Sequence, residues 1–192
     1  LLQKALREVL GEHVHQAGSY QDDQITHFDF THFSAVSPAE LAEVERRGNE
    51  KIYEALPVTV KNLPIEEAKK MGAMALFGEK YGSVVRVVDA GGWSTEFCGG
   101  THVTNTAQIG CFKIVSESSV AAGIRRIEAG TGRNLLIRAN MQEAMLHNVA
   151  NTLKANNVTA LPVRAEAVKA ENKAMSKELE ELKAKIAASK VD

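Results

Sequence analysis

The residues best suited to chemistry form the segment Cys98-Gly99-Gly100-Thr101-His102. Two consecutive glycines disfavour a helix, so we expect a tight turn after a strand that brings the Cys98 thiolate and the His102 imidazole to one ion. Zinc accepts both ligands but needs one or two more. The turn also offers backbone N–H groups that can polarise a carbonyl oxygen. Taken alone, this spacing also fits a buried structural cysteine beside an unrelated histidine.

Several histidines in the sequence are candidates for the further metal ligands. His13 or His15, or the pair His27 and His32, are able to complete a zinc site, although each taken singly fits a surface or core histidine. Cys111 stands in an apolar segment, which favours core packing over chemistry.

Other classes of function lack their sequence signals. Neither a G-x-S-x-G nucleophile motif nor a phosphate-binding P-loop is present, so we expect no ATP site. Two cysteines are too few for a disulfide framework, which indicates a reducing compartment, most simply the cytoplasm. The chain has no run of about 18 apolar residues, so the sequence predicts no membrane span. The net charge of −1 gives no hint of nucleic-acid binding.

Helical patterns occur at three places in the first part of the chain. Residues 1–10 repeat apolar side chains at helical spacing, and Gly11 ends that pattern. Ser37 followed by proline predicts the start of a helix over 38–55. A third helix is expected to open at Pro64 and to continue to about residue 77.

Strand-like runs separated by turns fill the rest of residues 1–133. They are ITHFDFTHF, VTVKNLPI, SVVRVV, STEF, GCFKIV and RRIEAG. Short turns between strands that follow one another favour antiparallel pairing. The predicted fold class is α+β, with an antiparallel or mixed sheet and helices packed on one side.

Residues 134–192 are predicted to be a helical arm, because the glycines vanish and Ala, Glu, Lys and Leu dominate. The segment NNVTALP divides the arm into two helices. Val168, Met175 and Leu182 repeat every seven residues, and such a seam packs on one partner helix. We expect the arm to fold back as an antiparallel hairpin; the alternative is a coiled-coil contact with another chain.

Six segments together resemble the editing domain of alanyl-tRNA synthetases. They are HQAGS at 15–19, HFDF at 27–30, ALFGEKYG at 75–82, CGGTHV at 98–103, IGCFKIVSE at 109–117 and GIRRIEAGTG at 123–132. The arm resembles the linker to that family's C-terminal domain, so the resemblance covers essentially the whole chain. It implies an editing domain over 1–133 with a threonyl/alanyl-tRNA synthetase editing fold.

The resemblance also implies a zinc-dependent site. Cys98 and His102 match the second half of the family's zinc ligands, whereas the first half, a histidine pair, is expected just before Leu1. With this half missing, we expect the chain to hold little zinc and to be feebly active or inactive. Gln16 matches the family's active-site glutamine, and Gly99 and Thr101 lie in the metal-bearing turn.

The implied reaction is hydrolysis of tRNA(Ala) that carries serine or glycine, and the implied partner is the rest of the synthetase. Independently, two adjacent guanidinium groups in a slightly acidic region predict that Arg125 and Arg126 contact the tRNA backbone. The alternative is one surface arginine and one salt-bridged structural arginine. Two other functions remain open: a freestanding trans-editing deacylase, and a non-catalytic tRNA-binding or oligomerisation piece.

Overall fold

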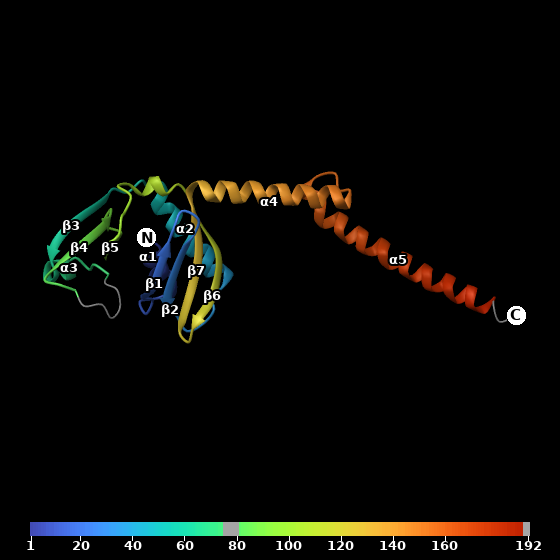
Figure 1. The fold of residues 1–192 in the computed structure, drawn as a ribbon, viewed down its shortest axis with the longest axis horizontal. Helices are drawn as coiled ribbons and strands as arrows, with labels where there is room; N and C mark the ends of the chain where they lie inside the picture. Colours follow the sequence, from blue (N-terminus) through green and yellow to red (C-terminus); the bar gives the residue numbers. More distant parts are fainter. Residues whose placement is uncertain (75–80, 190–192) are drawn as a thin grey trace. The chain divides into compact units, whose positions relative to one another are not determined.

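The computed structural model describes residues 1–74 and 81–189 and divides into two compact units. The first unit is Leu1–Leu136 and the second is Ile137–Asp192. Figure 1 shows that the first unit holds all the described strands, while helix makes up most of the second. The α+β class expected from the sequence is confirmed.

A four-stranded antiparallel sheet, the large sheet, carries the main core of the first unit. Its order is β1-β2-β7-β6, with bounds β1 Gln16–Gln21, β2 Thr26–Thr31, β7 Ile124–Thr131 and β6 Phe112–Ala121. Strand β1 was not predicted, because QAGSYQ lacks β-branched residues and most of it is exposed at the sheet edge.

A separate three-stranded sheet, the small sheet, has the order β3-β4-β5. Its antiparallel strands are β3 Val58–Pro64, β4 Val84–Ala90 and β5 Ser94–Phe97. The expected antiparallel pairing is present, and the strands are divided between two sheets. Strand β4 pairs with β3 and β5 on its two sides, and the small sheet buries its own cluster of Ala68, Val85, Val87 and Phe97.

Two helices cover the core of the large sheet. They are α1 Leu2–Leu10 and α2 Pro38–Tyr53, which bury Leu6 and Val44 in one cluster with Phe30 and Ile127. Helix α1 ends at Gly11, whose φ of 116° suits glycine. Helix α2 has Ser37 as its N-cap and a proline at its start, as the sequence predicted, and a capping box also joins Ser37 to Glu40.

Two short helical elements pack on different parts of the first unit, one on the small sheet and the other on α2. Helix α3 spans Ile65–Lys70, and the 3₁₀ turn η1 spans Thr106–Ile109. Helix α3 is shorter than predicted, because Gly72 adopts a φ of 72° and Met74 pairs as an isolated bridge with Glu96. Residues 75–80, which include most of the ALFGEKYG segment and the expected end of this helix, lie outside the described residues.

The second unit consists of most of α4 Gly132–Leu153, a 3₁₀ turn η2 Val158–Ala160 and α5 Leu161–Ala188. Both predicted helices are present, and the break between them, residues 154–160, overlaps the NNVTALP segment. None of the described helices is long and apolar enough to cross a membrane.

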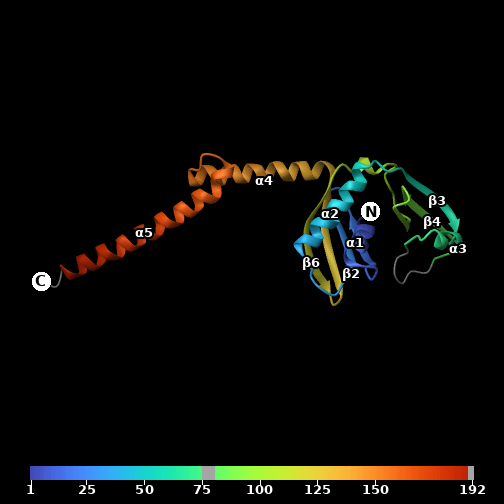
Figure 2. The same ribbon diagram turned by 180° about the vertical axis from the view of Figure 1, so that it is seen from behind.

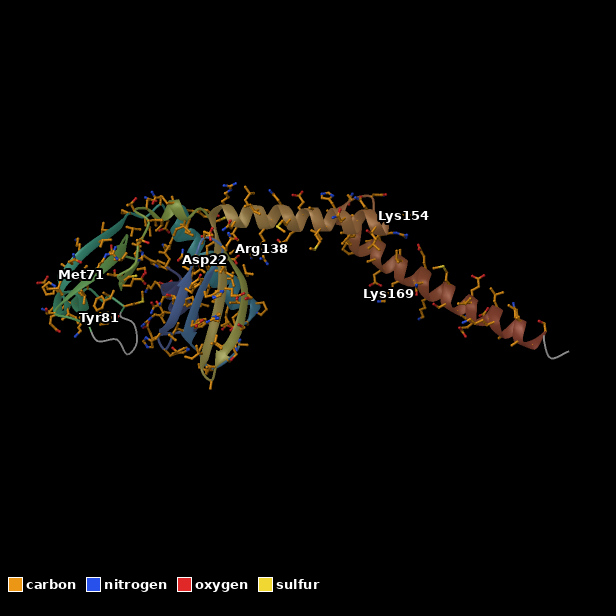
Figure 3. The ribbon with its side chains drawn as sticks, in the orientation of Figure 1. Asp22, Met71, Tyr81, Arg138, Lys154 and Lys169 are labelled. Atoms are coloured by element: carbon orange, nitrogen blue, oxygen red, sulfur yellow. The ribbon has the colours of Figure 1, made fainter. Side chains whose placement is uncertain are left out.

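The two helices do not pack as the expected hairpin. Figures 1 and 2 show α5 leading away from the end of α4. Arg164 Nε donates to the Leu153 carbonyl at 2.8 Å, which ties only the first turn of α5 to α4. The seam side chains Met175 and Leu182 are 61% and 48% exposed. Figure 3 shows side chains standing out from α5, Lys169 among them. Heptad spacing creates a face able to pack, but the connecting turn decides which helix lies against it.

Candidate active site

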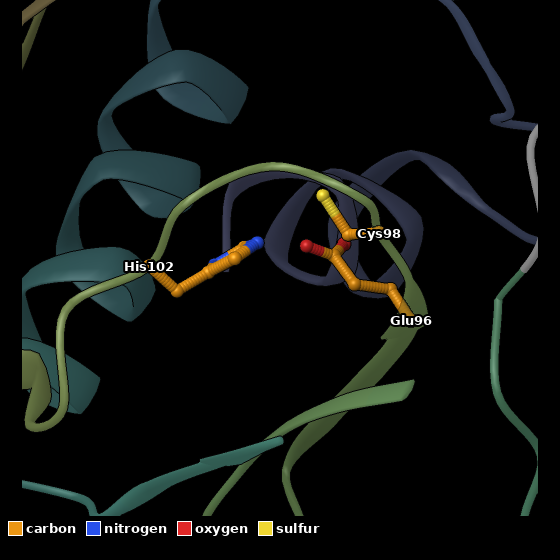
Figure 4. Close-up of side chains that lie close together, drawn as sticks. All are labelled: Glu96, Cys98 and His102. Atoms are coloured by element: carbon orange, nitrogen blue, oxygen red, sulfur yellow. The ribbon is translucent and has the colours of Figure 1, made fainter. Parts of the chain in front are cut away.

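Three potential metal ligands converge where the small sheet ends. Strand β5 alternates its faces, so Phe97 enters the core while Glu96 and Cys98 share the opposite face. The chain then turns through two glycines to His102. Ligand atoms of Glu96, Cys98 and His102 all lie within 4.8 Å of one another. Figure 4 shows the three side chains pointing toward one another.

The donor set of this cluster fits zinc. One thiolate, one imidazole and one carboxylate are ligand types found in zinc sites, and three protein ligands leave a position for water or substrate. Within residues 1–74 and 81–189 this is the only such group of three. Sequence reasoning found Cys98 and His102 but missed Glu96. The signal was present, because a residue two before Cys98 in a strand must share its face.

The imidazole of His102 is held in the form that binds metals. Desolvation lowers the pKa of His102 and Arg86 lowers it further, whereas Glu96 opposes this shift. A neutral ring keeps a lone pair free for a metal ion. Leu1, which precedes α1, lines the same cavity as His102.

Arg86 fixes the shape of the glycine turn. Its Nη1 donates to the carbonyl oxygens of Cys98 at 2.5 Å and of Gly100 at 2.7 Å. In a trans peptide the N–H points opposite to the C=O, so the N–H groups of Gly99 and Thr101 point away from this guanidinium. Neither N–H has an acceptor among the described residues. Sequence reasoning missed Arg86, because the motif shows nothing about what holds it.

A cavity of about 510 Å³ adjoins the turn. Residues of both sheets of the first unit line this cavity. They are Gln16 of β1, Arg86 of β4 and the turn residues Cys98 and Gly99. Gln16 Nε2 donates to Ser19 Oγ at 3.0 Å. The structure thus brings three predicted site residues to one cavity. Thr101 does not line it and is exposed.

A second cavity of about 680 Å³ lies on the other side of the donor cluster. His102 and Glu96 line it, and Glu96 lines the smaller cavity as well. The larger cavity reaches Asp23 in the β1–β2 turn and Asn134 in the first turn of α4. The donor cluster is therefore accessible from two hollows of the first unit.

The other candidate histidines do not join the cluster. His13 Nε2 and His32 Nδ1 are 2.8 Å apart and hydrogen-bond to each other. His27 Nε2 lies 3.3 Å from Glu128 Oε1. In the described part of the chain, none of these rings belongs to a group of three potential metal ligands. Cys111 is half-buried, with its sulfur 3.9 Å from the Gly132 carbonyl oxygen.

Both arginines of the predicted tRNA contact are paired with carboxylates. Arg125 binds Glu117 through Nε at 2.5 Å and Nη2 at 2.7 Å, and Arg126 binds Asp29 at 2.6 and 2.8 Å. Neighbouring residues in a strand point to opposite faces, so the two guanidinium groups do not form one patch. The Arg126 side chain is 34% exposed, against 15% for Arg125. The bond from Arg126 lowers the pKa of Asp29.

Comparison with known proteins gives matches over the whole chain. The family described as "Threonyl and Alanyl tRNA synthetase second additional domain" matches residues 85–128. The alanine–tRNA ligase of Acetivibrio thermocellus is 52% identical over 192 residues, which are 100% of this chain and 22% of the relative. Those of Bacillus subtilis and Halalkalibacterium halodurans are 52% and 50% identical over 186 residues, 97% of this chain and 21% of each relative. The chain thus spans about a fifth of the length of these relatives.

Proposed function

Because this chain belongs to the alanine–tRNA ligase family, we propose that its first unit hydrolyses tRNA(Ala) that carries serine or glycine. The observation that supports this best is the convergence of Glu96, Cys98 and His102 beside a turn with two N–H groups that have no acceptor in the described part of the chain. A cavity large enough for a small ligand adjoins them.

The need for such a reaction follows from the limits of binding. A pocket that accepts alanine cannot exclude the smaller glycine, and it rejects serine poorly because one hydroxyl adds little bulk. A second site that hydrolyses the wrong products removes both errors.

In the proposed reaction, water attacks the ester carbonyl carbon and the bond to the ribose oxygen breaks. The proton of the water ends on that ribose oxygen, so the products are a free amino acid and uncharged tRNA. Of the turn N–H groups at Gly99 and Thr101, the one at Gly99, which lines the cavity, holds the oxyanion that develops on the carbonyl oxygen. Arg86 keeps those N–H groups oriented through its bonds to the turn carbonyls. Gln16, on the same cavity, orients the aminoacyl group.

Cys98, His102 and Glu96 are the residues that would hold zinc. A bound zinc ion would polarise the ester or its attacking water. The resemblance to the editing domain implies two further histidines just before Leu1, and Leu1 lines one cavity together with His102. With three donors of its own, the chain is proposed to bind zinc weakly, and the histidine pair to raise that affinity.

Contacts with the tRNA backbone are proposed for Arg125 and Arg126. Arg126 is the better placed, because its side chain is more exposed and Asp29 occupies only its Nε and Nη2 donors. The other proposed partner is the rest of the synthetase, and the proposed compartment is the cytoplasm.

A deacylation assay with two cysteine variants tests this function. The chain is incubated with zinc and with seryl-, glycyl- or alanyl-tRNA(Ala), and the release of free amino acid is followed. We expect slow release of serine and glycine and retention of alanine. Cys98→Ala should lose the activity, whereas Cys111→Ala keeps it, because Cys111 lies outside the donor cluster.

Two outcomes would contradict the proposal. One is no release of serine or glycine above the uncatalysed rate at saturating zinc. The other is equal loss in both cysteine variants, which would indicate damage to the fold. Tight tRNA binding without release would favour the non-catalytic tRNA-binding alternative.

A further inference from the structure

Strand β1 contains an irregularity beside the candidate active site. Its register with β2 shifts between Gln16 and Gly18, where two steps along β1 oppose one step along β2, so Ala17 is an extra residue. Such a β-bulge offsets the alternation of side chains by one position. In a regular strand, residues three apart point to opposite faces of the sheet, but this bulge lets Gln16 and Ser19 share a face.

The pairing with β2 identifies that face. Directly opposite residues of antiparallel strands lie on the same side of the sheet. Gln16 lies opposite Phe30 and Ser19 opposite Phe28, and both phenylalanines belong to the core cluster of the large sheet. The side chains of Gln16 and Ser19 therefore point toward the interior side of the sheet, where both residues line the cavity of about 510 Å³.

A hydrogen bond between these two side chains determines which end of the Gln16 amide is available to a ligand. A glutamine amide has a donor end and an acceptor end. Gln16 Nε2 donates to Ser19 Oγ at 3.0 Å, whereas Oε1 accepts no hydrogen bond in the described part of the chain. Gln16 therefore offers an acceptor to the cavity that it lines.

The aminoacyl groups of the proposed function supply a matching donor. Their carbonyl and ester oxygens only accept hydrogen bonds, and the seryl hydroxyl is missing from the glycyl form. The α-amino group is common to both forms, and it carries N–H donors whether or not it is protonated. An acceptor that serves both substrates must therefore bind the α-amino group.

We propose that Ser19 and the β1 bulge position the Gln16 amide so that its Oε1 accepts a hydrogen bond from the α-amino group of the aminoacyl ester. The inference rests on the proposed function, which supplies the ligand. Gln16 contacts the ligand in this arrangement, and Ser19 acts through Gln16 as a positioning residue. A side chain that is already held in its bound orientation loses less rotational freedom on binding, so the hydrogen bond contributes more to affinity.

The test measures how strongly the chain prefers a ligand that carries an α-amino group. The probes are non-hydrolysable adenosine analogues with a 3′-amide. One carries a seryl group, and the other carries a 3-hydroxypropanoyl group, which has the same carbonyl and hydroxyl but hydrogen in place of the amino group. Calorimetry with the 192-residue chain and zinc gives both Kd values. Wild type should bind the seryl probe about tenfold more tightly, as expected for one well-formed hydrogen bond.

Substitutions of the two residues separate positioning from packing. Ser19→Ala should reduce the preference to about twofold, because the amide is no longer fixed, while the 3-hydroxypropanoyl probe binds as before and the urea midpoint stays the same. Ser19→Thr keeps the hydroxyl, suits a strand and should restore the preference. Gln16→Glu keeps an acceptor and should preserve the preference. The control Ser118→Ala, at an exposed position of β6 on the other edge of the sheet, should change neither Kd.

Three results would overturn the inference while the proposed function stands. They are equal Kd values for the two probes in wild type, an unchanged preference in Ser19→Ala, and loss of the preference in Gln16→Glu, which would show that the amide acts as a donor. A fall of the affinity for both probes together with the urea midpoint in Ser19→Ala would assign Ser19 a merely structural role and overturn the inference as well. If wild type binds neither probe, the proposed function itself fails, and the inference falls with it.

Discussion

The two sheets of the first unit differ in what they bury and in what they offer to a ligand. The large sheet and its helices hold Phe30, Leu6, Ile127, Val14 and Val44, all nearly inaccessible to solvent. In the small sheet only Val87 is buried to that extent, yet its end carries the donor cluster and the glycine turn. Stability and chemistry are therefore concentrated in different sheets, and residues such as Gln16 connect them across one cavity.

The largest expected effect comes from replacing one buried phenylalanine in each sheet and comparing the loss of stability. Phe30→Ala removes a fully buried ring from the large sheet and should lower the free energy of unfolding by about 3 to 5 kcal/mol. Phe97→Ala acts on the smaller cluster, so we expect it to open β3, β4 and β5 locally. Urea unfolding measures the first effect, and amide hydrogen exchange locates the second.

Hydrogen exchange also gives the result that would break the contrast. If Phe97→Ala accelerates exchange in the large sheet as much as in the small one, the two sheets unfold as a single cooperative unit. The separation of stability from chemistry would then be wrong.

Local sequence signals predicted the parts of the site that depend on neighbouring residues. The Cys98–His102 turn follows from two glycines after a strand, and the start of α2 follows from Ser37 and proline. Contacts between distant segments were not predictable in this way. Arg86 meets the turn only because β4 pairs with β5, and Gln16 reaches the cavity only because β1 joins the large sheet edge. The exposed face of α5 shows the same limit, because seven-residue periodicity does not determine which helix packs against it.

The next largest effect concerns the number of metal ligands at the end of the small sheet. Structural zinc sites with four ligands gain roughly 10–16 kcal/mol, or about 3 kcal/mol for each ligand, so losing one should weaken zinc binding about 100-fold. Glu96→Gln should therefore lower zinc affinity by about that factor, as measured by competition with a chelator. Glu67→Gln, exposed on α3, is the matched control. Unchanged affinity in Glu96→Gln would exclude this carboxylate as a ligand.

The same assay tests the histidine pair. A chain extended by about two helical turns before Leu1, with the pair in place, should bind zinc more tightly and deacylate faster than the 192-residue chain. Cys98→Ala in the extended chain should abolish its activity. Tight, stoichiometric zinc in the short chain that survives Cys98→Ala would point instead to His13, His15, His27 or His32.

A smaller effect, on the salt dependence of tRNA binding, tests whether the large sheet contacts the tRNA. Each phosphate contact that is lost should flatten the dependence of log K on log salt by about 0.7 to 0.9. Arg126→Gln should show this change, and Arg125→Gln a weaker one, because Arg125 is more buried. The Asp29 pair is partly exposed, so Arg126→Gln should cost little stability. Unchanged slopes in both variants would leave tRNA binding to other residues.

The smallest effect is a pH dependence at the end of β2, next to the core of the large sheet. Burial and the neighbouring His13 lower the pKa of His32; Glu40 and Glu117 oppose this shift, and Arg125 adds to it. The unfolded chain therefore takes up the proton first as the pH falls through about 6.5, and the native state loses stability until the lower native pKa is passed. Protonation of both rings would also break the 2.8 Å hydrogen bond between His13 and His32. His32→Phe should remove the slope of unfolding free energy between pH 7 and pH 5 that this group contributes, because an aromatic ring still fills the space beside Phe30 and Phe33. The control His147→Phe, on an exposed position of α4, should keep it. An identical slope in wild type and His32→Phe would show that the histidine pair does not couple folding to pH.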